Sequence, residues 1–143
     1  MKQATVRAAT AADAMVRHPK VHPATLTVGE ARHVLTDDHV HMVLLTQHGH
    51  LVGTLLRDDV PAAAADEDLA LRWAQLRGRT VTSSTPVEVV RQRLVELGQR
   101  RAAVVGDDGQ LLGLVCLKRK LSGFCSDADV AARRCEHATM RIG

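Results

Sequence analysis

The chain has 143 residues, of which 45% are apolar, so it is long enough to bury one compact core or two small cores that share a surface. Its formal charge is +3, and its Lys and Arg residues are scattered among 16 acidic residues, which excludes a basic stripe for nucleic acid. Trp73 and Phe124 are its aromatic residues, which excludes a stacking platform for nucleotide bases. No segment approaches the ~20 apolar residues of a membrane span, and three cysteines without a CxxC pair predict no disulfide framework, so we expect a cytoplasmic protein.

The first predicted element is a short extended lead-in over 20–22, followed by a helix. The sequence "TVGE" places Thr27 as the helix N-cap and Glu30 three residues later, which is a capping box. The apolar side chains after it recur at helical spacing and predict one buried stripe. The stripe consists of Val28, Ala31 and Leu35.

Two apolar strands are expected next, over 41–46 and 51–56. The turn "QHGH" lies between them, and its glycine, Gly49, suits the positive φ of a hairpin turn. A second helix is expected over 57–65, and "ADEDLALRWAQL" predicts a helix over 65–76 that connects to the second half of the chain.

The second half begins with an extended lead-in over 80–82 and a second capped helix. Here "TPVE" predicts Thr85 as the N-cap, Pro86 at the first helical position and Glu88 at the third. The predicted buried stripe is Val87, Val90, Leu94 and Leu97. Two strands follow, over 102–105 and 110–116, joined by the turn "GDDG", and then a helix over 117–124.

The second half therefore repeats the first. Gly49 and Gly53 match Gly109 and Gly113 at an offset of sixty positions, and the helix residues match at fifty-nine, which a loop insertion explains. Each unit reads helix, strand, strand, helix behind its lead-in, and at about 50 residues it is too small to be stable alone. We expect an α/β (α+β) fold in which two repeats pack with pseudo-twofold symmetry around a shared cleft.

The hairpins "HGHLVG" and "DGQLLG" each follow a capped helix at the same distance. This order of motifs resembles the cystathionine-β-synthase (CBS) domain, and its duplication resembles the tandem CBS pair called a Bateman module. The resemblance assigns 14–65 to the first repeat and 66–124, with the connecting helix, to the second. It leaves 1–13 as an N-terminal lead-in and 125–143 as a tail or last helix.

The resemblance also implies a binding site. In CBS domains the junction after the second strand often reads G-h-h-T/S-x-x-D, in which the Asp accepts hydrogen bonds from both ribose hydroxyls of an adenine nucleotide. The first repeat keeps Asp59 but has Leu56 at the hydroxyl position. The second repeat has Cys116 and Arg119 in place of the hydroxyl and the carboxylate. The predicted ligand-binding residues are Asp59, Arg57, Val21, Met42, Arg101, Lys118 and Arg119.

The same residues also have structural interpretations. Asp58 and Asp59 fit the start of a helix, where acidic side chains complement the helix dipole. The basic run 118–120 fits a solvated, positively charged helix start. Seven of the eight histidines lie in the first half, but no carboxylate or thiol completes a known ligand spacing, and the C-x9-C-x-H pattern of the tail lacks a full ligand set. We therefore predict no metal site.

Two functions are predicted. The first is a regulatory sensor, not an enzyme, that requires no cofactor, binds AMP, ADP, ATP or S-adenosylmethionine between its repeats and regulates an unidentified partner protein. The alternative is a ligand-free interaction module with degenerate nucleotide sites, which forms a homodimer through the helices of its repeats. The sequence contains no nucleophile elbow, phosphate-binding glycine loop or recognition helix, so neither catalysis nor binding to nucleic acid or membrane is expected.

Overall fold

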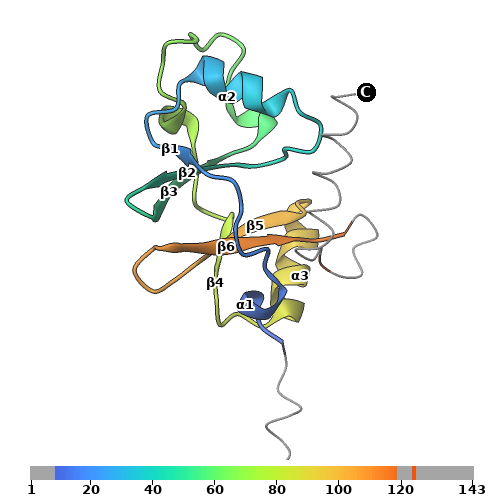
Figure 1. Ribbon diagram of the computed structural model, residues 1–143. Helices are drawn as coiled ribbons and strands as arrows, with labels where there is room; N and C mark the ends of the chain where they lie inside the picture. Colours follow the sequence, from blue (N-terminus) through green and yellow to red (C-terminus); the bar gives the residue numbers. More distant parts are fainter. Residues whose placement is uncertain (1–8, 119–123, 125–143) are drawn as a thin grey trace, which may run out of the picture. The chain divides into compact units, whose positions relative to one another are not determined.

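The structure, a computed structural model, describes residues 9–118 and 124. Its described part contains two three-stranded sheets with the same strand order, β1-β2-β3 and β4-β5-β6 (Figure 1). Short helices accompany each sheet. This arrangement confirms the predicted α+β class with two repeated sheets.

The described residues divide into two compact units. The first-repeat unit contains Lys20–Thr80 and Val105–Leu111. The second-repeat unit contains the described residues of three segments, which are 1–19, 81–104 and 112–143. This grouping differs from the ranges 14–65 and 66–124, because residues 66–80 belong with the first repeat and the N-terminal segment belongs with the second.

In the first-repeat unit, β1 (His22–Pro23) pairs in parallel with β2 (Val43–Gln47), and β2 pairs antiparallel with β3 (His50–Leu55). The turn between β2 and β3 has two positive φ angles, 53° at His48 and 81° at Gly49, as a tight hairpin requires. Helix α2 (Val28–Leu35) buries its predicted stripe against this sheet. The core cluster consists of Leu26, Ala31, Leu35, Val43, Leu45, Leu55 and Ala70.

The predicted capping box of α2 is confirmed. The Thr27 N–H donates to Glu30 Oε1 at 2.9 Å, and the Glu30 N–H donates to Thr27 Oγ1 at 3.2 Å. These two bonds satisfy backbone donors that the first helical turn leaves without a partner. The exposed Glu30 carboxylate accepts from both the backbone and the side chain of Thr27, and these bonds lower its pKa.

The second-repeat sheet contains β4 (Thr80–Thr82), β5 (Arg101–Val105) and β6 (Leu111–Cys116), and helix α3 (Val87–Leu97) packs on it (Figure 1). The core cluster consists of Ala11, Val81, Val90, Leu94, Ala102, Val104, Val115 and Leu117. Helix α3 ends where Gly98 takes a left-handed φ of 67°.

Three sequence predictions for α3 are wrong. No side chain caps its start, because Thr85 Oγ1 shares a hydrogen bond with Thr82 Oγ1 and the Glu88 carboxylate accepts from Arg91 Nε at 3.0 Å. Pro86 is the N-cap and not the first helical residue. Leu97 is 53% exposed, since it is the last residue of the helix and lies outside the core cluster.

The chain segment before each sheet bonds to the other sheet: the segment before β1 bonds to β6, and the segment before β4 bonds to β3. Helix α1 (Ala11–Ala14) is followed by Val16, which exchanges two backbone hydrogen bonds with Leu114 of β6, at 2.7 and 3.0 Å. The 3₁₀ helix η3 (Ala70–Trp73) is followed by Gln75, which exchanges two with Thr54 of β3, both 2.9 Å. These contacts lie fifty-nine to sixty positions apart, so the internal repeat begins at the N-terminal segment.

Two further predicted helices are shorter than expected, and a third falls largely outside the described residues. Over 57–65 only η2 (Arg57–Asp59) forms, because Val60 precedes a proline and takes an extended conformation. Over 65–76 only η3 is helical, since backbone groups there bond outside the segment. The bonds are Val28 N–H to Asp68 O, Gly29 N–H to Asp66 O, Ala70 N–H to Leu26 O, and the Thr54–Gln75 pair. Over 117–124, Leu117 forms an antiparallel bridge with Phe124, and 119–123 lie outside the described residues, as does the tail from 125.

Candidate functional site

The candidate site is the junction at which β3 passes into η2 in the first-repeat unit. Gly53 lies so close to η3 that an added Cβ would be 2.5 Å from Ala74 Cβ. The next residue, Thr54, is fully buried, and its hydroxyl donates to Gln75 O at 2.5 Å. The glycine therefore permits the close approach that ties β3 to the segment before β4.

At the end of this junction the Asp59 carboxylate forms a bidentate ion pair with Arg79. Arg79 Nη2 donates to Asp59 Oδ1 at 2.8 Å, and Nη1 donates to Oδ2. Each side chain is only 9% exposed. The Leu56 N–H also donates to Oδ2, at 2.6 Å, and Arg79 Nη1 reaches Thr54 O at 3.4 Å.

The ionisation of Asp59 depends on these donors. Burial disfavours the charged carboxylate, but the hydrogen bonds from Arg79 and from the Leu56 N–H, together with the charge of Arg79, outweigh it. The pKa of Asp59 is therefore lowered, and the carboxylate stays ionised at neutral pH. A charged acceptor for hydroxyl donors is present at the position that the CBS resemblance implies.

Arg57, also predicted to bind ligand, caps the C-terminus of α2. Its Nε donates to Leu35 O at 3.1 Å, and its Nη2 donates to the same oxygen. Nη2 also reaches Asp37 O at 3.2 Å and Val40 O at 3.1 Å. The guanidinium thus satisfies the Leu35 carbonyl group, which the last helical turn leaves without an intrahelical partner, and two carbonyl groups of the loop that follows.

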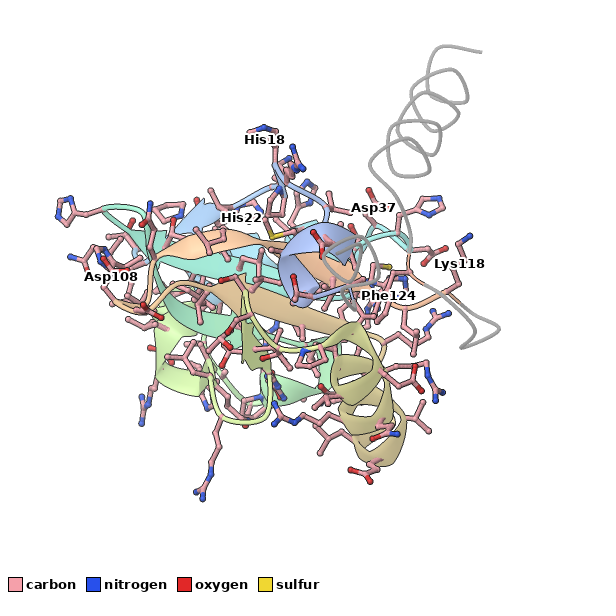
Figure 2. The ribbon with its side chains drawn as sticks, turned by 90° about the horizontal axis from the view of Figure 1, so that it is seen from below. His18, His22, Asp37, Asp108, Lys118 and Phe124 are labelled. Carbon is pink, nitrogen blue, oxygen red and sulfur yellow. The ribbon has the colours of Figure 1, made fainter. Side chains whose placement is uncertain are left out.

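The other predicted site residues are divided between the two units. Val21 and Met42 belong to the first-repeat unit, where Val21 is 44% exposed and Met42 is buried. Arg101 and Lys118 belong to the second-repeat unit. Figure 2 shows Lys118 just beyond the end of β6 with its ammonium group directed away from the chain. Arg119 lies outside the described residues.

The matching junction of the second-repeat unit is apolar. Cys116 at the hydroxyl position is buried, and the next residue, Leu117, donates its N–H to Arg100 O at 2.7 Å. Gly113 makes the same close approach as its counterpart, since an added Cβ would lie 2.6 Å from Met15 Sδ. This junction keeps the close approach at the glycine but, among its described residues, presents no carboxylate.

Arg79 is the residue that the sequence analysis missed. It lies at the end of the segment that crosses to β3, twenty positions after Asp59, and no motif connects the two. One physical signal was present, because an aspartate placed beside a buried strand requires a cation or several donors. The choice among several nearby arginines needs the tertiary structure.

Comparisons with known proteins agree with this architecture. The CBS domain model matches residues 79–119. The cytosolic domain of the Mg2+ channel MgtE in complex with ATP is similar with a TM-score of 0.64 and 19% identity, over 76% of this chain and 46% of that one. CBSX2 in complex with AMP has a TM-score of 0.66 and 21% identity, over 87% and 97%.

A third similar structure is the CBS domain protein PAE2072 from Pyrobaculum aerophilum, complexed with AMP, with a TM-score of 0.63, 22% identity and coverage of 78% and 94%. No curated protein matches the chain. The chain spans less than half of the MgtE domain but nearly all of the other two. The chain has the fold of tandem CBS pairs, and residues 79–119 match the CBS domain model, so the predicted resemblance is confirmed.

Metal-ligand clusters and membrane-spanning helices are both absent from the described part of the chain. Within residues 9–118 and 124, no three His, Cys, Asp or Glu side chains are grouped so as to hold a metal ion. The helices of this same part are too short or too polar to cross a membrane. His18, a member of the histidine-rich first half, projects away from the ribbon (Figure 2).

Proposed function

We propose that this chain is a regulatory module that binds an adenine nucleotide or a related adenosyl ligand and thereby alters the activity of a partner protein. The observation that carries the proposal is the ionised Asp59 at the end of the β3 junction. The fold is one in which similar proteins have been solved with AMP or ATP.

In this proposal Asp59 accepts hydrogen bonds from the ribose hydroxyls, because one carboxylate offers two oxygens to two neighbouring donors. Val21 and Met42, which belong to the same unit as Asp59, supply aliphatic contacts to adenine. Arg57 supports the site indirectly by fixing the end of α2. No covalent bond changes, so the role is regulation and not catalysis.

Calorimetric titration with AMP, ADP, ATP and S-adenosylmethionine tests the proposal. We expect at least one of them to bind, and Asp59→Asn to weaken it about tenfold or more, since a hydrogen bond to a charged group contributes about 1.5–3 kcal/mol. Asp58→Asn is the matched control, because Asp58 is the adjacent carboxylate and is exposed. Absence of binding by all four, or equal binding by the two variants, contradicts the proposal.

A second candidate function is a ligand-free dimerising module. It is favoured by the ion pair that occupies Asp59 and by two exposed apolar residues of α3, Val95 at 43% and Leu97 at 53%. We propose that α3 takes part in a homodimer contact if this function holds. Sedimentation equilibrium would show a dimer that Val95→Glu dissociates and that Gln92→Glu, at an exposed polar position of α3, does not. A monomer at all concentrations contradicts it.

A further inference from the structure

The hydrogen-bonding capacity of Asp59 is almost fully used within the chain. A carboxylate offers about four lone-pair positions. Arg79 takes one on each oxygen, and the Leu56 N–H takes another on Oδ2. About one position remains, on Oδ1, whereas the vicinal hydroxyls of a ribose need two. Since Asp59 is 9% exposed, a diol cannot add to the pair from outside.

Separating Asp59 from Arg79 requires a new partner for each of the two charged groups. Both side chains are 9% exposed, and an unpaired charge in such surroundings is strongly destabilised. If ribose hydroxyls take over the Asp59 carboxylate, the guanidinium of Arg79 loses its counter-ion at the same moment. A ligand that binds well must therefore supply replacements for both members of the pair.

We infer that Arg79 determines the specificity of this site, by occupying Asp59 until a ligand arrives that carries both a vicinal diol and an anionic group. The diol replaces the guanidinium at Asp59, and the anion, such as a phosphate, becomes the new partner of Arg79. Arginine suits this exchange because its planar donors bind carboxylate and phosphate with the same two-point geometry. The inference rests on the proposed function and restricts its ligand class to ribonucleotides.

The test compares AMP, adenosine and 2′,3′-dideoxy-AMP by calorimetry against the wild-type chain, Arg79→Met and the control Arg77→Met. Arg77 is two residues away and exposed. We expect the wild type to bind AMP about ten- to a hundredfold more tightly than adenosine, and to bind the dideoxy compound weakly. In Arg79→Met the ratio of the affinity for AMP to that for adenosine should fall toward one, because adenosine binds more tightly than in the wild type. Arg77→Met should keep the wild-type ratio.

Because Arg79→Met leaves the Asp59 carboxylate without its cation, the melting temperature of this variant is measured first. If Arg79→Met does not fold, Arg79→Lys takes its place. Lysine keeps the charge but donates from a single point, so the AMP preference in Arg79→Lys should lie between those of wild type and Arg79→Met. If the wild type binds AMP but the ratio of AMP affinity to adenosine affinity is unchanged in the Arg79 variants, the inference is overturned and the proposed function stands. If the wild type binds none of the three compounds, the inference fails, and the proposed function fails with it only if ADP, ATP and S-adenosylmethionine do not bind either.

Discussion

Replacing Gly53 with alanine should separate β3 from the segment that crosses to it. The new Cβ would lie 2.5 Å from Ala74 Cβ and 3.2 Å from Leu71 Cδ1, whereas carbon atoms pack at about 3.5–4.0 Å. A Cβ is attached directly to its backbone, so the segment around Ala74 must shift by about 1 Å. That shift weakens the two 2.9 Å bonds between Thr54 and Gln75. Overpacking and lost hydrogen bonds together predict a cost of about 2–4 kcal/mol.

Urea unfolding of a double-mutant cycle measures this contact. Adding Ala74→Gly removes the nearest atom, so Gly53→Ala/Ala74→Gly should lose less stability than the sum of the single variants. The matched Gly113→Ala should cost at least as much, because its Cβ would meet Val16 O at 2.7 Å as well as the side chain of Met15. Met15→Ala should not rescue it, since the backbone oxygen remains. Strict additivity at Gly53 and Ala74, or a cost below 0.5 kcal/mol, would refute the reasoning.

Three further outcomes are expected. Thr27→Ala should lower the free energy of unfolding by about 1 kcal/mol because it removes the cap of α2, and Thr85→Ala, which removes no cap, should cost clearly less in the same urea experiment. Arg57→Met should destabilise the chain by about 1–3 kcal/mol by leaving the last carbonyl group of α2 and two of the following loop unpaired, with loss of amide protection near the end of α2 in hydrogen exchange. Since the pKa of Asp59 is lowered in the folded state, its contribution is present above the unfolded value near 3.9 and is lost as pH falls through the folded value. The stability gap between wild type and Asp59→Asn should therefore be widest at neutral pH and shrink in acid, and a gap that widens below pH 4 would contradict the assignment.

Much of the fold could be predicted because its signals are local. A capping box fixes the start of α2, and a glycine with positive φ marks each hairpin, at Gly49 and Gly109. The apolar stripes identify the buried faces of the helices, apart from Val87, which is half-buried, and Leu97, which is exposed at the end of α3. The duplication was visible because both hairpins place glycines at the same spacing, and for the same reason the CBS resemblance could be stated from the sequence.

The errors fall where backbone groups bond to distant segments. The region over 65–76 has helical composition, but beyond a few local turns its N–H and C=O groups bond to Leu26, to the start of α2 and to β3. Sequence periodicity cannot detect this competition. The partner of Asp59 was missed for the same reason, because Arg79 approaches it only after the crossing segment has packed on β3. The ligand-binding roles of the other predicted residues stay predictions.

The crossing of α1 into the second-repeat unit has a consequence for biosynthesis. The α1 segment leaves the ribosome well before the strand to which it bonds, because β6 is among the last described elements to be made. Until then its donors and acceptors must be satisfied by water or by a chaperone. A cut after Thr80 would likewise leave the second-repeat unit without the N-terminal segment that bonds to β6, so complementation of separately expressed fragments should require both to be present during refolding.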